Sequence, residues 1–158
     1  MGRWNITADD VITVTPTVGA GADFTFDAGD LIFDSAEIAN AVTRPGGVAW
    51  LQSIVVLCKA DAKAAFTLVF ANASTDFGTV DGAPNPDDTE ALTVIGTVAV
   101  AASDYVDLGA SSVATLRNIA LPLKAAAGAT SLYVAGINGT GTPTFESGGL
   151  VLKLGFLR

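Results

Sequence analysis

The chain has 158 residues, of which 50% are hydrophobic and only 15% are charged. Because about a quarter of the residues of an ordinary soluble domain are charged, part of this protein's surface must be uncharged. Eight Lys and Arg residues against sixteen Asp and Glu residues give a net charge of −8, which disfavours contact with nucleic acids and anionic membranes. The sequence contains no histidine, so the usual general base and the commonest metal ligand are missing. We therefore expect a protein that is not an enzyme.

The length predicts one domain over residues 1–158, with residues 1–9 as an N-terminal arm. The first ten residues, MGRWNITADD, have no apolar segment of the kind found in a secretory signal. The most apolar part of the chain, residues 48–70, contains too many polar residues for a spanning helix. We expect the protein to stay in the compartment where it is made.

Alternation of apolar and polar residues with a period of two recurs along the chain, and this pattern predicts half-buried β-strands. In chain order, the predicted strands cover residues 12–15, 24–26, 31–33, 38–42, 51–59, 66–70, 93–101, 115–123, 132–138 and 150–156. Segments rich in Gly, Pro, Asn and Asp separate them, as tight turns require. Short strands at this spacing predict an all-β fold, a single-domain antiparallel β-sandwich or jelly roll.

Three segments call for separate treatment. Residues 85–92, NPDDTEAL, begin with a proline and acidic residues, which predicts one or two helical turns. Residues 35–42 resemble a short helix in composition, but two apolar anchors are too few for a helix and we favour a strand. Pro122 falls inside a predicted strand and cannot donate a ladder hydrogen bond, so that strand should lie at an edge or carry a bulge.

Residues 48–59, VAWLQSIVVLCK, and 64–70, AAFTLVF, are predicted as two strands joined by a polar turn. Their nearly continuous hydrophobicity predicts cover on both faces. Strict alternation in the first strand opposes two apolar sets, namely Leu51, Val55 and Leu57 against Ile54, Val56 and Cys58. One face must meet the core, and the other must be covered by a loop of the chain or by another subunit.

The carboxylates of DFTFDAGDLIFD are the first candidates for chemistry: Asp23, Asp27, Asp30 and Asp34. Two of them could act as the acid and base of glycoside hydrolysis if their carboxyl groups lay about 5 to 10 Å apart. The flanking glycine makes a turn of this segment. We therefore expect turn caps and solvated strand ends, and we predict no catalytic or cofactor-binding residue.

Residues 81–90, DGAPNPDDTE, contain the oxygen ligands that calcium prefers. Their spacing does not match the D-x-D-x-D-G loop, so we expect a capped turn with a solvated acidic edge and predict no metal ligand or cofactor. A structural calcium ion stays the alternative. The lone cysteine, Cys58, is expected to be a small buried hydrophobic residue rather than a reactive thiol.

The Trp and Tyr side chains could form a platform that stacks on sugars, although such rings are more often core or interface anchors. The chain has two of each: Trp4, Trp50, Tyr105 and Tyr133. An exposed Trp near a terminus is otherwise hard to justify, so Trp4 and Ile6 are predicted to contact another subunit or a capsid. Trp50, Val55 and Leu57 of the apolar segment complete these interface candidates.

Four segments, taken in order, carry a resemblance to a known family: DLIFDSAEIANAV, LQSIVVLCKADAKAAFTLVFANAS, TVIGTVAVAASDYVDLGASSVATLRNIALPLKA and SLYVAGINGTGTPTFESGGLVLKLGFL. This order resembles a family of small virion structural proteins of tailed bacteriophages. Some members are capsid decoration, or cement, proteins with a jelly-roll fold. The resemblance covers roughly residues 30 to 157 and rests on strand patterns, and the N-terminal stretch GRWNITADD does not share it.

The resemblance implies a virion structural protein that binds the major capsid protein on the outer surface of the shell and bridges capsomers. It also implies a homotrimer, or else a dimer, made in the cytoplasm of the bacterial host. Three alternatives stay open from the sequence: a carbohydrate-binding module, a tail or baseplate component, and a glycosidase-like enzyme that uses a pair of Asp residues.

Overall fold

The structure is a computed structural model that describes residues 11–19 and 23–158, and nearly all of its regular structure is β-strand. The strands are β1 (Val11–Val14), β2 (Phe24–Thr25), β3 (Leu31–Ile38), β4 (Val48–Cys58), β5 (Ala65–Ala71), β6 (Val94–Val100), β7 (Tyr105–Asp107), β8 (Ser112–Lys124), β9 (Leu132–Thr140), β10 (Thr144–Phe145) and β11 (Leu150–Leu157). One helical turn, α1 (Asp88–Ala91), and one 3-10 turn, η2 (Ala102–Asp104), complete the elements. None of the described helices is long and apolar enough to cross a membrane.

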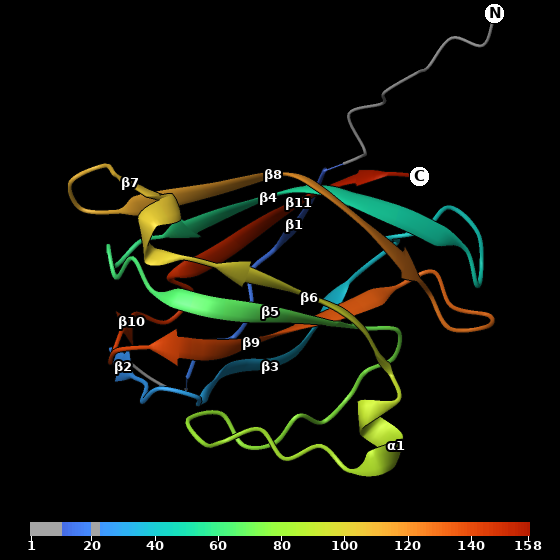
Figure 1. The fold of residues 1–158 in the computed structure, drawn as a ribbon, viewed down its shortest axis with the longest axis horizontal. Coiled ribbons are helices and arrows are strands. Elements are labelled where there is room, and N and C mark those ends of the chain that lie inside the picture. The colour runs from blue at the N-terminus through green and yellow to red at the C-terminus, as the bar shows by residue number, and fades with distance from the viewer. Residues whose placement is uncertain (1–10, 20–22) are drawn as a thin grey trace, which may run out of the picture.

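The strands form a five-stranded sheet in the order β1-β11-β4-β8-β7 and a four-stranded sheet in the order β3-β9-β5-β6, both antiparallel (Figure 1). Strands β2 and β10 make a separate two-stranded ribbon. Without the three shortest strands, β2, β7 and β10, eight strands remain. If these eight are counted from 1 to 8 in chain order, the two sheets have the orders 1-8-3-6 and 2-7-4-5. Among the eight, only the fourth and fifth strands, β5 and β6, are consecutive within one sheet, and this is the topology of a jelly roll. The predicted fold class is confirmed.

The core lies between the two sheets and is built mainly from alternate residues of the long strands. From β4 and β5 it receives side chains that are at most 1% exposed: Ala49, Leu51, Ile54, Val56, Cys58, Phe66, Leu68 and Phe70. Each fully buried Leu, Ile or Phe side chain stabilises the fold by roughly 1.5 to 3 kcal/mol. Cys58 is fully buried, as the sequence predicts.

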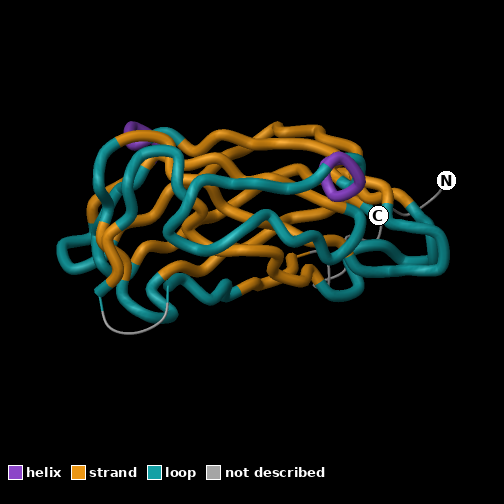
Figure 2. Tube along the Cα trace, turned by 90° about the horizontal axis from the view of Figure 1, so that it is seen from below, coloured by secondary structure: helices purple, strands orange, loops and turns teal. Residues whose placement is uncertain are grey.

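The outer face of the four-stranded sheet is covered by residues 72–93, which we call the cover loop. Phe77 of this loop packs on a second apolar cluster that includes Val69 and Ala71 of β5 and Ala135 of β9. Figure 1 shows the loop with α1 beside β3 and β9, and Figure 2 shows it from below, in front of the strands. The second apolar face of residues 64–70 is therefore covered by a loop of the same chain.

Polar contacts hold the cover loop against β3. The Phe77 backbone N–H donates to Oδ1 of Asp34 at 3.1 Å, and the Thr75 N–H donates to Oγ of Ser35 at 3.1 Å. Leu31 exchanges backbone hydrogen bonds of 2.9 Å with Asp81 and Gly82. Because these contacts occupy the free edge of β3, they also protect it from pairing with another strand.

The predicted helical turn is confirmed as α1, which begins after Asp87. Oδ1 of Asp87 accepts a hydrogen bond of 2.7 Å from the Glu90 N–H, and Oε2 of Glu90 accepts one of 2.7 Å from the Asp87 N–H. This reciprocal pair is a capping box. Asp87 therefore acts as a helix cap, which is the structural role that the sequence favoured over calcium binding.

Some predicted boundaries were wrong. Residues 31–33 and 38–42 were predicted as separate strands, whereas β3 runs without interruption from Leu31 to Ile38 and the chain then turns at Asn40, whose φ is 54°. The strand interpretation of residues 35–42 is thus right only up to Ile38. Strands β7 and β10 were not predicted, because segments of two or three residues show no periodicity.

The predicted faces of β4 were also wrong at one position. Leu51 pairs with Leu121 of β8, and Ser53 pairs with Arg117, so three residues of β8 oppose a single residue of β4. In this irregular stretch Asn118 and Ala120 have positive φ values of 57° and 51°. Against β11, Leu51 and Ser53 pair with adjacent residues, so Gln52 is one extra residue of β4. This bulge brings Leu51 onto the same buried face as Ile54 and Val56, instead of opposite to them.

The prediction for Pro122 is confirmed in both respects. It lies two residues beyond this bulge, in a part of β8 that pairs only with β4, since β7 reaches only Ser112 to Ala114. The nitrogen of Pro122 therefore does not interrupt a central ladder.

We predict that Phe77→Ala detaches the cover loop from the four-stranded sheet. Phe77 is 3% exposed, and removal of a buried Phe side chain lowers the free energy of unfolding by about 3 to 5 kcal/mol. Urea unfolding measures this loss, and limited proteolysis should cleave the variant within residues 78–86. Leu92→Ala is the matched control, because Leu92 lies in the same loop but is 83% exposed. Equal stability of the two variants would contradict the covering role of Phe77.

Candidate functional site

The face of the five-stranded sheet that points away from the core has no covering segment among the described residues. We call it the open face. Five large hydrophobic side chains on it are exposed: Val11 (56%), Val48 (48%), Trp50 (45%), Val106 (62%) and Leu157 (44%). Only two other large hydrophobic residues of the described chain are as exposed, Leu92 and Leu108. Exposed apolar side chains that gather on one face are typical of an interaction site.

Cross-strand pairing arranges the apolar side chains of the open face in two rows. The first row crosses four strands through Val151, Leu57, Val113 and Val106. The second row crosses three strands through Leu157, Trp50 and Pro122. Directly opposite residues have Cβ atoms about 5 Å apart, so each row is continuous. Along β4 the rows are about 20 Å apart, at a rise of roughly 3.3 Å per residue.

Two lines of residues that are mainly polar, although they include Val11 and Val55, separate the two apolar rows, and we call them the polar band. It contains Thr13, Lys153, Val55 and Thr115 in one line and Val11, Gly155, Ser53 and Arg117 in the next. Lys153 and Arg117 thus stand on opposite sides of β4, and both are exposed. A third cation, Lys124, lies opposite Val48 beyond the Trp50 row.

The open face is basic, although the protein as a whole is acidic. Strands β1, β4, β8 and β11 contain no Asp or Glu, and the only acidic residue of β7 is Asp107. Among the described residues, no carboxylate forms an ion pair with Arg117, Lys124 or Lys153. The cover loop on the other side of the sandwich exposes acidic residues instead, among them Asp76, Asp81, Asp87 and Asp88. The two sides of the molecule therefore carry opposite charge.

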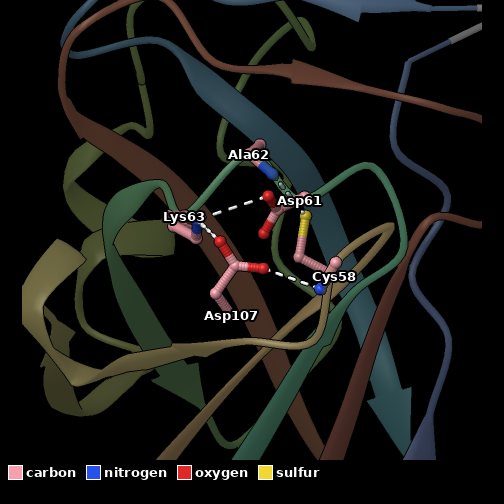
Figure 3. Close-up of polar contacts among 6 residues, drawn as sticks. Cys58, Asp61, Ala62, Lys63 and Asp107 are labelled. Atoms are coloured by element: carbon pink, nitrogen blue, oxygen red, sulfur yellow. Dashed lines mark hydrogen bonds and ion pairs between the residues drawn. The ribbon is translucent and has the colours of Figure 1, made fainter.

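Asp107 does not neutralise the open face, because it is bound by Lys63 of the β4–β5 turn (Figure 3). Nζ of Lys63 lies 2.7 Å from Oδ2 of Asp107 and 3.3 Å from Oδ2 of Asp61. The Gly109 N–H donates to Oδ1 of Asp107 at 2.7 Å. The hydrogen bond from Lys63 is the main cause that lowers the pKa of Asp107, and the same bond raises the pKa of Lys63.

We predict that Lys63→Met raises the pKa of the Asp107 carboxyl towards its ordinary value, because the variant removes the main donor to it. Because the pKa of Asp107 is lowered, the Lys63–Asp107 contact is fully formed above the ordinary pKa of Asp and is lost as the pH falls through the folded-state pKa of Asp107. Because the pKa of Lys63 is raised, the high-pH limit is set by Lys63: its charge is intact up to pH 10.5, and the contact is lost as the pH rises through the folded-state pKa of Lys63. An NMR titration of the Asp107 carboxyl carbon measures the shift. Lys59→Met, in the same turn, should leave the titration unchanged, and equal effects of both variants would refute the pairing.

The structure places three of the interface candidates on the open face. Trp50 lies in the second apolar row, Leu57 in the first and Val55 in the polar band. The bulge in β4 is the reason that Trp50 shares a face with Val55 and Leu57. Trp4 and Ile6 lie outside the described residues.

The remaining candidates do not assemble into a second site among the described residues. Tyr105 packs on the main core and Tyr133 on the cluster beneath the cover loop, so these two rings and Trp50 do not form one stacking platform. Burial raises the pKa of Tyr105. Oδ2 of Asp30 accepts a hydrogen bond from the Asp27 N–H at 3.1 Å, as expected of a turn residue. In the described part of the chain, no three Asp, Glu or Cys side chains are grouped as metal ligands.

A groove of about 810 Å³ lies between the edge strands β1 and β3. Its acidic side chains and its serine are engaged: Asp34 and Ser35 hold the cover loop, and Oε1 of Glu37 accepts a hydrogen bond from Ser131 Oγ at 2.6 Å. Four threonines also line the groove: Thr13, Thr15, Thr17 and Thr79. The aromatic ring that lines it belongs to Phe24, which packs at 5.2 Å from Phe26. Among the described residues, the groove therefore lacks a pair of free carboxylates beside an open aromatic face, although threonine hydroxyls line it.

Sequence reasoning missed the three cations of the open face as a set. The signal was present in the sequence, because four strands of this sheet contain no acidic residue although the chain has sixteen. The pattern becomes meaningful only when the strand order brings β11, β4 and β8 together.

Comparisons with known proteins add little to this picture. No family model and no curated protein matches the sequence. Among solved structures, the crystal structure of the infectious bursal disease virus VP2 subviral particle is similar over 100% of this chain, with 12% sequence identity and a TM-score of 0.38. The chain spans 37% of the length of that protein. A likeness this distant carries no functional inference.

Proposed function

We propose that the protein is a non-enzymatic structural component of a tailed-bacteriophage virion, which binds the outer surface of the capsid and stabilises it by bridging capsomers. The observation that carries the proposal is the open face, a flat apolar and basic surface without cover among the described residues. The jelly-roll topology and the resemblance to virion structural proteins support it. The proposed partner is the major capsid protein.

The open face can stabilise a shell by simple mass action. Transfer of its exposed apolar area out of water contributes about 25 cal/mol per Å². A ligand that binds the assembled shell and not the free subunits shifts the assembly equilibrium towards the shell. Linking several copies, as in the proposed homotrimer, multiplies weak contacts through their effective concentration.

The proposed location is tested by immunogold labelling of purified particles of the virus that encodes the protein. Gold on the outer shell is the expected result. Gold restricted to the tail or baseplate would support that alternative role instead, and its absence from particles would overturn the virion assignment.

We further predict that Trp50→Ala weakens binding to shells that lack the protein by about 30-fold, because aromatic anchors at interface centres contribute about 2 kcal/mol or more. The fold should stay intact, since Trp50 is 45% exposed. Co-sedimentation with shells measures the affinity, and unfolding in urea confirms stability. Leu92→Ala is the control, because it removes an exposed apolar side chain outside the open face. Undiminished binding of Trp50→Ala would exclude the open face as the attachment surface.

A further inference from the structure

We propose that the open face docks on a protein surface of one particular chemistry, namely carboxylates placed between two apolar contacts, and that this surface belongs to a different protein rather than to a second copy of this chain. The proposal rests on the proposed function for the identity of the partner, the capsid shell. The charges and the row spacing of the open face carry the rest.

The cations of the open face require acidic partners. Arg117 and Lys153 flank β4 between the two apolar rows, so docking of both rows covers both cations. Neither of them forms an ion pair with a described carboxylate. A charge that is removed from water without a partner is strongly destabilising. The docked surface must therefore bring its own Asp or Glu side chains into the band between the rows.

Two-fold pairing of open faces is disfavoured by the same charges. A two-fold contact brings the same patch together on both subunits. Lys124, Lys153 and Arg117 of one copy would then face the same residues of the other, with no acidic residue of β1, β4, β8 or β11 to separate them.

A head-to-tail contact with the chain's own acidic side is also disfavoured. The cover loop lies outside the four-stranded sheet, on the side of the sandwich opposite to the open face. Contact between opposite sides of identical subunits continues as a filament instead of closing into a ring. The subunits of a homotrimer would consequently meet through other surfaces.

The geometry defines the complementary surface. Its two apolar contacts are about 20 Å apart, to match the Leu57 and Trp50 rows along β4. Two carboxylates lie between these contacts, for Lys153 and Arg117, and a third lies beyond the Trp50 row for Lys124. In this orientation the acidic cover loop points away from the shell, where its charge keeps neighbouring particles apart.

The experiment compares two double variants of the full chain that have the same net charge. Arg117→Gln with Lys153→Gln changes the open face, and Ala83→Glu with Leu92→Glu, the turn variant, changes exposed residues of the cover loop on the other side of the sandwich. The first pair removes two positive charges and the second adds two negative charges, so the net charge goes from −8 to −10 in both. We expect the open-face variant to bind purified shells at least about tenfold more weakly, and the turn variant to bind like the unchanged protein. Equal losses would overturn the proposal.

A chromatography resin whose ligand joins a carboxylate to a phenyl ring tests the face without any virus. The unchanged protein and the turn variant should be retained despite their negative net charge, and the open-face variant should flow through. If all three proteins elute together, the inference is overturned, whatever the result of the shell-binding experiment. If the resin separates them and the shells bind none of them, this inference is supported and the proposed function is wrong.

Carbodiimide cross-linking of intact particles identifies the docked surface directly. Isopeptide bonds from Lys153 or Lys124 to Asp or Glu of the shell protein are the expected products. Bonds from these lysines to carboxylates of another copy of this chain would overturn the proposal. So would binding to phosphatidylserine vesicles that the open-face variant loses and the turn variant keeps, because the partner would then be a lipid surface.

Discussion

A two-layer β-sandwich has four sheet faces, and packing of the two layers buries only the inner pair. In this protein the inner faces of β4 and β5 supply fully buried side chains such as Ile54, Val56 and Phe70 to the core. The strands are apolar on their outer faces too, so each outer face must be covered by another segment or stay exposed to solvent. The cover loop covers the outer face of the four-stranded sheet through Phe77. The outer face of the five-stranded sheet has no such cover in the described chain, and its exposed apolar rows follow from this asymmetry.

A bulge in β4 at Gln52 determines which side chains reach the open face. With regular alternation, Trp50 would point into the core and Leu51 would lie outside with Val55 and Leu57. Because Leu51 and Ser53 pair with adjacent residues of β11, Gln52 is one extra residue, and the strand changes parity between Leu51 and Ser53. A one-residue change in register exchanges the two faces of everything beyond it. Trp50 therefore becomes an exposed anchor, and Leu51 is fully buried.

Charge follows the same division between the two sides. Many acidic residues lie in turns and in the cover loop. Asp34 of β3 and Asp87 of the cover loop also accept hydrogen bonds from backbone N–H groups. The cations Arg117, Lys124 and Lys153 project from strands that have no acidic residues. The net charge of −8 does not show this separation. It predicts a negative surface, whereas the surface that we propose as the docking site is positive.

The sequence alone determined the all-β class and most strands, because period-two alternation and Gly- and Pro-rich turns are local features that do not depend on contacts. It indicated the jelly-roll type only through the resemblance, since the strand order is a property of the fold. It also indicated one helical turn at residues 85–92, the special position of Pro122, and an apolar surface in need of cover. The tertiary structure alone decided which outer face is covered, since that depends on where the loop after β5 folds back. Only the tertiary structure could place Leu51 inside and Trp50 outside, because the bulge at Gln52 arises from the pairing of β4 with its neighbours β11 and β8. It alone also gathered Lys153, Arg117 and Lys124 on one surface, because residues far apart along the chain become neighbours only through the order of the strands.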